Sequence, residues 1–251
     1  TAYIDDFEAA KRSYDLKMIG SWFLASTPQD YNTSAPLFPE TSKDLGLTYG
    51  FNRAKIAWYS IDDNFYTPSA PSNITNNDKS QPYARPIKET EIRPNKEIPQ
   101  GQIQTLREFN IAYYPSERGP YNFDTLSAYS AGLNPDGTLR APETRWGGIM
   151  RKLESTDFEA TNIEYIEFWL MDPFIENPYH SGGKLYFNLG EGSEDILRDG
   201  RKSFENGLPI SSEIIDVDST IWGRVPKLQA VVNAFSNDPQ SRQYQDIGYD
   251  G

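Results

Sequence analysis

Two carboxylates stand close together in the stretch NIEYIEFWLMDPF, residues 162–174, so paired-carboxylate chemistry is the first to consider. A glycoside hydrolase needs two carboxyl groups about 5 to 10 Å apart across one cleft. Glu164 and Glu167 are three positions apart, so on a β-strand their side chains point to opposite faces. No E-x-D-x-E run supplies another partner, and the spacing therefore argues against a glycoside hydrolase.

Nucleophilic catalysis has no better support. The single histidine, His180, lies in the turn-like stretch NPYHSGG, and no G-x-S-x-G stretch accompanies it. The chain has no Cys, which excludes thiolate nucleophiles, thiolate metal sites and disulfides together. No glycine-rich phosphate loop precedes a lysine. We therefore expect a protein that is not an enzyme.

Aromatic and polar side chains share one predicted strand face, which suggests ligand binding. Alternation places Ile166, Phe168 and Leu170 on an apolar face of residues 163–171 and leaves the opposite face mixed. A second predicted strand, KLYFNLGE at 184–191, repeats this scheme. Together the mixed faces give one candidate glycan site, in which rings lie against sugar C–H groups and polar groups bond hydroxyls: Tyr165, Glu167, Trp169, Tyr186 and Asn188. The alternative, which we favour, is that the long loop at 62–104 or a partner chain covers this face.

Acidic residues near the start of the chain could hold a hard cation. In YIDDFE, Asp6 and Glu8 share one face of a predicted strand, and Ca²⁺ prefers such oxygen ligands. The alternative is a solvent-exposed edge strand. The final residues DIGYDG, 246–251, match only the first half of a calcium loop, so a structural Ca²⁺ at Asp6 and Glu8 is the one cofactor hypothesis.

Composition narrows the classes of partner. The chain has 251 residues, with 24 Lys and Arg against 36 Asp and Glu, so its formal charge is 24 − 36 = −12. So acidic a surface repels phosphate backbones and anionic lipid, and we expect no nucleic-acid partner. No apolar run reaches the length of a membrane helix. The chain opens at TAYIDDFEAA without Met or signal peptide, which we interpret as a piece of a longer precursor.

Short alternating runs separated by turn clusters predict an all-β fold. We expect an antiparallel β-sandwich of the jelly-roll type, with one or two short helices and a single domain over residues 1–251. The stretch YIDDFEAA (3–10) followed by SWFLAST (21–27) resembles the opening of a galactose-binding-like jelly roll. A Pro- and Asn-rich loop would span about 62–104, and a tail would leave the domain at about 236–251. The predicted strands cover residues 2–10, 20–27, 53–61, 108–115, 145–153, 163–171 and 184–191. The predicted helices cover 193–207 and 225–240.

Several longer blocks resemble one known family. These are ERGPYNFD (117–124), the block RWGGIMRKLESTDFEATNIEYIEFWLMDPF (145–174), the block GGKLYFNLGEGSEDILRDGRKSFENGLP (182–209) and QYQDIGYDG (243–251). They resemble the SprA (Sov) family, the outer-membrane translocon proteins of the type IX secretion system. The resemblance runs over most of the chain and is weakest at 28–48 and 62–104.

The resemblance implies a role in protein export and gliding motility. The chain would be a jelly-roll domain beside a large transmembrane β-barrel, in the cell envelope and associated with the outer membrane. Its partners would be the rest of that barrel, other secretion-system proteins and secreted cargo. The family supplies no catalytic residues to carry over. A carbohydrate-binding module at the cell surface stays the alternative.

Overall fold

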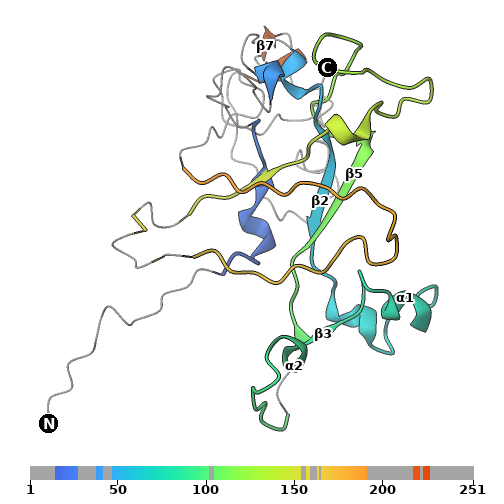
Figure 1. Ribbon diagram of the computed structural model, residues 1–251, viewed down its shortest axis with the longest axis vertical. Coiled ribbons are helices and arrows are strands. Elements are labelled where there is room, and N and C mark those ends of the chain that lie inside the picture. Colours follow the sequence, from blue (N-terminus) through green and yellow to red (C-terminus); the bar gives the residue numbers. More distant parts are fainter. Residues whose placement is uncertain are drawn as a thin grey trace, which may run out of the picture. The chain divides into compact units, whose positions relative to one another are not determined.

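Short strands dominate the regular structure of this protein. The computed structural model describes residues 15–27, 38–41, 47–101, 105–153, 157–158, 163, 165–190, 217–220 and 223–226 (Figure 1). Its strands are β1 (Phe23–Leu24), β2 (Ala54–Tyr59), β3 (Ile87–Lys88), β4 (Thr105–Leu106), β5 (Asn110–Arg118), β6 (Ile149–Met150), β7 (Val217–Thr220) and β8 (Gly223–Pro226). Its helices are η1 (Ile19–Ser21), η2 (Pro39–Thr41), η3 (Leu47–Gly50), η4 (Asp63–Tyr66), α1 (Asn76–Ser80), α2 (Glu89–Ile92) and η5 (Pro142–Thr144).

The strands form pairs rather than large sheets. In the described residues the pairs are β1–β6, β2–β5, β3–β4 and β7–β8. Three of these pairs are antiparallel, with registers that place Phe23 opposite Met150, Ile87 opposite Leu106 and Val217 opposite Pro226. Within the described ranges, short antiparallel strand pairs with two short α-helices agree with the all-β class expected from the sequence.

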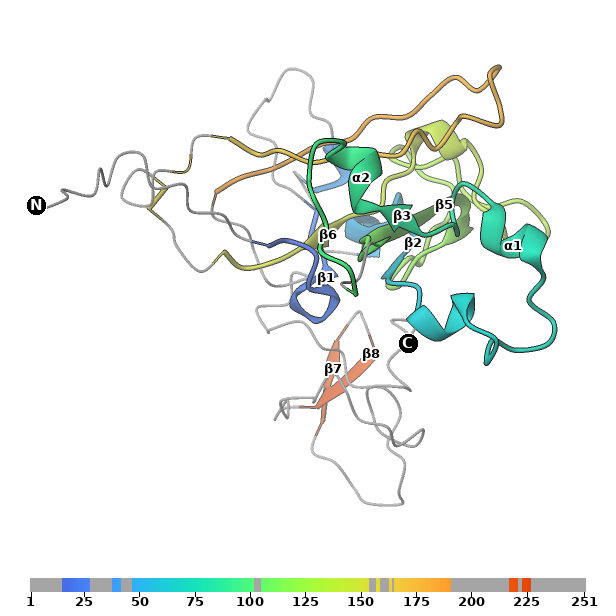
Figure 2. The same cartoon turned by 90° about the horizontal axis from the view of Figure 1, so that it is seen from below.

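The pair β2–β5 contains the longest strands (Figures 1 and 2). The sequence AKIAWY of β2 mixes β-branched and aromatic residues, which suit a half-buried pleated surface. β5 contains Pro115, which cannot donate a ladder hydrogen bond. Proline is tolerated on edge strands, and both strands of a two-stranded sheet are edges. The sequence predicted both strands, at 53–61 and 108–115.

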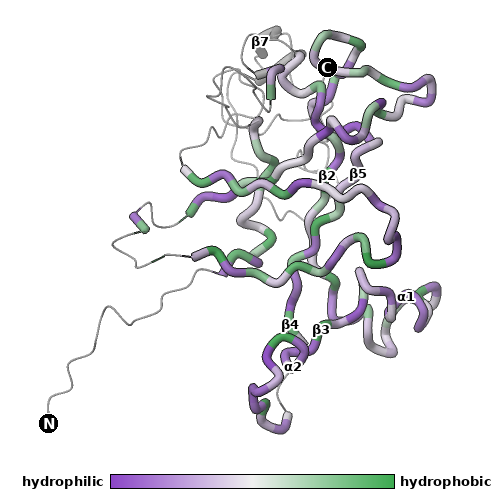
Figure 3. Tube along the Cα trace, viewed as in Figure 1, coloured by the Kyte–Doolittle hydropathy of each residue, from purple (hydrophilic) through white to green (hydrophobic). Residues whose placement is uncertain are grey.

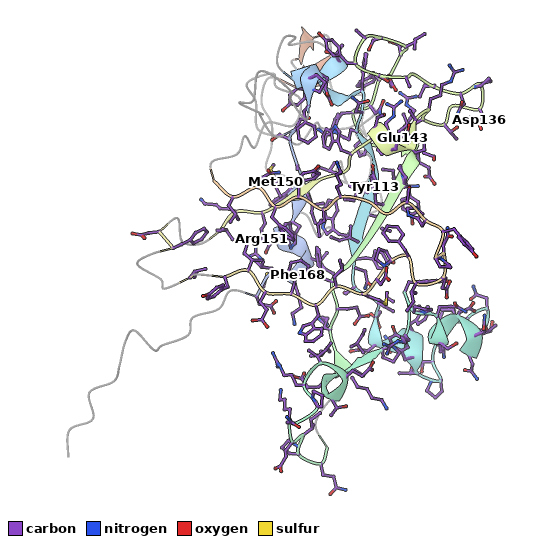
Figure 4. The ribbon with its side chains drawn as sticks, in the orientation of Figure 1. Tyr113, Asp136, Glu143, Met150, Arg151 and Phe168 are labelled. Atoms are coloured by element: carbon purple, nitrogen blue, oxygen red, sulfur yellow. The ribbon has the colours of Figure 1, made fainter. Side chains whose placement is uncertain are left out.

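Two glycines of the block RWGG let backbone approach side chains closely. A Cβ at Gly147 would lie 3.0 Å from the ring of Tyr113 and 3.2 Å from Cβ of Ile56, and one at Gly148 would lie 3.1 Å from Cβ of Ala25. Both glycines therefore lie at points of close packing, where a larger residue would displace a neighbour. Burial of the Tyr113 side chain, labelled in Figure 4, raises its pKa to about 12.

The predicted long loop contains short ordered elements. Helix α1 begins with a capping box, in which Thr75 Oγ1 accepts from the Asp78 N–H at 3.2 Å and the Asp78 carboxylate accepts from the Thr75 N–H at 2.7 Å. Helix α2 follows β3 directly, and Glu89 binds Arg93 at 2.7 Å and Lys96 at 3.0 Å. Residues 62–101 are therefore an ordered excursion with its own local hydrogen bonds.

The buried interior contains more polar than hydrophobic residues. Figure 3 shows hydrophobic positions spread along the whole described trace rather than gathered in one layer. The buried hydrophobic residues are Tyr49, Phe51, Ala54, Ala84, Tyr121 and Leu139. The buried polar residues are Ser26, Thr27, Glu40, Asn52, Arg53, Glu89, Asn122, Asp124, Ser130 and Arg145. Hydrogen bonding must therefore contribute much of the order in the described part of the chain.

Two predicted strands are not formed. Residues 165–171 and 184–190 are described without a strand assignment, although both carry the expected alternation. A strand exists only as part of a ladder, and sequence alternation alone does not supply the neighbour. The predicted helix at 225–240 is wrong at its start, because Val225 and Pro226 belong to β8. The rest of that helix, the helix at 193–207, the strand at 2–10 and the tail at 236–251 lie outside the described residues.

The chain divides into two compact units. The first unit contains Thr1–Ser21, Trp58–Asn110 and Arg151–Lys184. The second contains Trp22–Ala57, Ile111–Met150 and Leu185–Gly251. The single jelly-roll domain over 1–251 stays a prediction.

Candidate functional site

The first part of the predicted ligand site lies on an exposed segment. Tyr165 is 82% exposed and Trp169 is 72% exposed, and Glu167 between them is exposed too. Residues 165–171 belong to the first unit and run as an extended trace from which Phe168 projects (Figure 4). These side chains are therefore open to a ligand or a partner in this structure.

The long loop does not cover this segment. We expected residues 62–104 to pack over Tyr165 and Trp169, and this expectation is wrong for both side chains because of their exposure. Polar groups of the loop instead bond to other groups within the loop. Tyr66 donates its hydroxyl hydrogen bond to the Ala84 carbonyl, and Arg85 pairs with Glu91 at 2.9 Å.

The second part of the predicted site lies on the other unit. Tyr186 is about half exposed, and Asn188 is exposed. Both belong to the stretch from Leu185 onward that the contact pattern assigns to the second unit. Tyr165, Glu167 and Trp169 therefore lie together on one exposed segment of the first unit, while Tyr186 and Asn188 lie on the second unit, and the glycan site that would combine them stays a prediction.

His180 has a local structural contact. Its Nδ1 accepts a hydrogen bond from the Gly182 N–H at 2.8 Å, and its ring stacks on Phe174 at 4.1 Å with 15° between the planes. Gly182 adopts a positive φ of 83°, which glycine tolerates freely. This confirms NPYHSGG as a turn with a histidine at its centre.

The predicted cation ligands cannot be placed. Asp6 and Glu8 lie outside the described residues, as do Asp246 and Asp250. Within the described ranges no three Asp, Glu or His side chains gather as a metal site would require. The calcium hypothesis at Asp6 and Glu8 stays a prediction.

The densest cluster of chemically capable side chains is buried in the second unit. Arg145 and Asp124 form an ion pair with 2.7 Å between Nη1 and Oδ2, and both side chains have no exposed surface. Ser130 donates to the Asp124 carboxylate at 2.5–2.6 Å. Arg145 also donates to three backbone carbonyls, those of Phe51 at 2.8 Å, Gly132 at 3.1 Å and Arg140 at 2.9 Å.

Asparagine side chains extend this cluster into the backbone. Asn122, which is fully buried, donates Nδ2 to the carbonyls of Phe51 at 3.0 Å and Arg53, and its Oδ1 accepts from the Asp124 N–H at 2.8 Å. Asn52 donates to the Tyr129 carbonyl at 2.8 Å. Each amide thus replaces hydrogen bonds that a ladder would otherwise supply to these loops.

A second buried cation stands beside an indole ring. The guanidinium carbon of Arg53 lies 4.8 Å from the ring centroid of Trp146, and Nη1 donates to the Ala25 carbonyl at 2.7 Å. Burial lowers the pKa of Arg53 to about 10. Trp146 Nε1 donates to Glu40 Oε1 at 3.2 Å, and burial raises the pKa of the Glu40 carboxyl.

The geometry of these side chains indicates a structural role and not a catalytic one. The hydroxyl of Ser130 donates to Asp124 and also accepts from the Gly132 N–H and from Arg145, and the whole group is buried. A nucleophile needs an open approach and a base positioned to remove its proton. The network, which we call the Arg145 cluster (Asn52, Asn122, Asp124, Ser130 and Arg145), therefore fixes loop positions.

Sequence reasoning missed the Arg145 cluster. Its members are scattered between residues 52 and 145, so no short spacing shows them together. The one signal was that two blocks quoted for their family resemblance, ERGPYNFD (117–124) and the block at 145–174, contain Asn122, Asp124 and Arg145. Unusual polar residues inside otherwise packed blocks are a reasonable sign of buried hydrogen bonding.

Comparison with protein-family models and with curated proteins finds no match to this chain. Across the described helices, none has the length and apolar character needed to cross a membrane.

Proposed function

We propose that this chain is a non-enzymatic interaction domain of a SprA-type outer-membrane translocon, acting in type IX protein secretion and gliding motility. The proposal begins from the resemblance of four sequence blocks to that family. Its site in the cell envelope, its attachment to a barrel and its contact with secreted cargo follow from the same resemblance.

One structural observation supports an interaction role: the exposed hydrophobic segment at 165–171. Tyr165, Trp169 and Leu170 are each more than 60% exposed. Large apolar side chains that are exposed next to each other mark surfaces that bind other molecules.

We further propose the jelly-roll arrangement for the assembled domain. Residues 165–171 and 184–190 have the alternating pattern of sandwich strands. Two-stranded sheets are marginal by themselves, and three or more strands with a covered face are needed for stable order. Pairing of these two segments with further strands would give the sheet that a sandwich requires.

Export measurements in cells test the proposal. Full-length translocon carrying Tyr165→Ser and Trp169→Ser is produced in a gliding bacterium that lacks its own translocon gene. We expect reduced secretion of type IX cargo and reduced colony spreading, with normal amounts of translocon in the outer membrane. Tyr83→Ser with Leu126→Ser is the matched control, because these hydrophobic side chains are 61% and 77% exposed elsewhere on the chain. Normal secretion by the first variant would count against the role.

Glycan binding is the second candidate function, and the open rings of Tyr165 and Trp169 favour it. Exposed aromatic faces can lie against sugar C–H groups, and Glu167 between them can accept hydroxyl hydrogen bonds. A glycan array with the purified chain tests this function. Two results together would replace the translocon role with a carbohydrate-binding role. Glycan binding by the purified chain would have to be lost in Trp169→Ser, and a strain carrying that variant would have to export cargo normally.

A further inference from the structure

Residues 165–179, which we call the aromatic–acidic stretch, hold the largest run of exposed apolar side chains in the described part of the chain. The stretch is in the first unit and ends in the turn at His180. Its exposed large hydrophobic residues are Tyr165, Ile166, Phe168, Trp169, Leu170, Met171, Ile175 and Tyr179. Exposing so much apolar area to water is unfavourable, so a partner that covers it gains binding free energy.

The backbone chemistry of the stretch selects the kind of partner. Residues 165–171 run as an extended trace and carry no strand assignment (Figure 1). A lipid phase offers no hydrogen bonds to a backbone segment, and a sugar offers hydroxyls without the repeat of a peptide. Another extended polypeptide offers N–H and C=O groups at the strand repeat together with alternating side chains. A peptide strand therefore fits residues 165–171 better than lipid or sugar does.

Charge selects the partner further. The stretch contains Glu167, Asp172 and Glu176, all exposed, and residues 165–183 contain no Lys or Arg. In the described part of the chain none of the ion pairs involves these three carboxylates. A second copy would bring the same acidic residues together, on a chain whose formal charge is −12. Like charges at an interface oppose association, whereas Lys or Arg would pair with these carboxylates and lie on the exposed rings.

We infer that residues 165–171 accept an added β-strand from a different polypeptide, an extended apolar segment flanked by Lys or Arg. The apolar side chains of that segment cover Trp169 and Leu170, and its basic ends lie near Asp172 and Glu176. This inference deepens the proposed function, because it names the partner class for the same exposed segment. It is tested by binding in solution, so it can fail without the export role failing.

The test uses the purified full chain and synthetic peptide probes. The first probe is about nine residues long, a typical strand length, with alternating valine and threonine and two lysines at each end. The second probe replaces every lysine with glutamate, and the third places proline at alternate positions to remove N–H donors. Each carries a fluorophore, and anisotropy measures binding at low and at raised salt.

We expect the lysine-flanked probe to bind, the proline probe to fail, and the glutamate-flanked probe to bind at least about tenfold more weakly. Raised salt should weaken the lysine-flanked probe. Replacing Glu167 and Asp172 by Lys should also lower its affinity about tenfold. Replacing Glu97 and Glu143 by Lys is the matched control, because both are exposed glutamates outside the stretch, and its affinity should stay unchanged.

Several outcomes would overturn the inference. Equal binding of the lysine and glutamate probes would remove the charge argument, and binding of the proline probe would remove strand addition. Concentration-dependent dimerisation in sedimentation, lost in Trp169→Ser, would make a second copy the occupant. Failure of every probe together with an export defect in the Tyr165→Ser, Trp169→Ser strain would sink this inference and leave the proposed function standing. Specific probe binding together with normal export would support this inference and count against the proposed function.

Discussion

The guanidinium of Arg145 and the carboxylate of Asp124 lie 2.7 Å apart, and neither side chain reaches solvent. Burying two charges is costly, and the cost is met only when both charges are paired and hydrogen-bonded. Here Ser130 donates to the carboxylate, and the carbonyls of Phe51, Gly132 and Arg140 accept further hydrogen bonds from the guanidinium. Removing one partner should therefore be much worse than removing both.

Breaking this pair should strongly destabilise the second unit. We expect Arg145→Met or Asp124→Leu alone to lower the free energy of unfolding by about 3 to 5 kcal/mol, because each leaves an uncompensated buried charge. The double variant should lose less than either single variant, because it leaves no unpaired buried charge. Urea denaturation followed by circular dichroism measures each value. The exposed pair Lys55–Glu117 is the control, and its removal should cost at most about 1 kcal/mol. Equal effects of the buried and exposed pairs would contradict this account.

The Glu40 carboxyl should make stability fall as pH rises. Burial raises its pKa above the ordinary 4.5, so it is neutral in both the folded and unfolded states at low pH. As pH rises past 4.5, the unfolded carboxyl ionises first, which favours unfolding until the folded carboxyl ionises as well. The free energy of unfolding falls by about 1.4 kcal/mol for each tenfold difference in proton affinity between the folded and the unfolded Glu40 carboxyl.

Glu40→Gln isolates this contribution, because glutamine resembles the neutral carboxyl and does not titrate. Urea midpoints measured from pH 4 to pH 8 should show the variant gaining on the natural protein as pH rises through the window above 4.5. Parallel curves for the two proteins would show that Glu40 does not titrate differently on unfolding.

The glycine at the end of β5 should not tolerate a side chain. A Cβ at Gly119 would lie 2.4 Å from the carbonyl oxygen of Ala54, closer than real atoms approach. We expect Gly119→Ala to lower the free energy of unfolding by about 1 to 3 kcal/mol, through displaced backbone. Gly183→Ala is the matched control, since its Cβ would only touch Phe174 at 3.9 Å, and thermal melting compares the two. Similar melting temperatures for both variants would argue against the close approach.

Replacing an exposed ring should leave stability intact. Trp169 is 72% exposed, so Trp169→Ser should change the free energy of unfolding by no more than about 0.5 kcal/mol. Leu139 is 2% exposed, and Leu139→Ala should cost about 2 to 5 kcal/mol as the buried comparison. A large loss in Trp169→Ser would mean that this indole belongs to a core in solution.

Sequence patterns predicted the strands and turns that depend on residues close together in the sequence. The alternating runs in β2 and β5 and the turns NPDGT and NPYHSGG are all set by residues close in sequence. In the first turn the Gly137 N–H bonds the Asn134 carbonyl at 3.0 Å, and Gly137 has a φ of 84°. Asp136, on that turn, accepts from Thr138, which holds the pKa of its carboxyl below the usual range (Figure 4).

The features that the sequence did not predict depend on contacts between residues that are distant in the sequence. Residues 165–171 have a strand pattern, yet a strand needs a neighbour that alternation does not name. The candidate glycan site stays a prediction for a related reason, because shared alternation at Trp169 and Tyr186 does not name the neighbour of either segment. The Arg145 cluster was invisible because Asp124 and Arg145 resemble ordinary surface charges until the fold buries them.

The sequence separation between Arg145 and its partners also affects folding during synthesis. Its hydrogen bond to the Phe51 carbonyl spans 94 residues, and its ion pair with Asp124 spans 21. A nascent chain that has emerged only as far as η5 contains Asp124 but not yet Arg145, so the buried ion pair cannot form. Fragments that end just before residue 145 should therefore be degraded by proteases faster than the full chain, because the Asp124 carboxylate has lost its ion-pair partner.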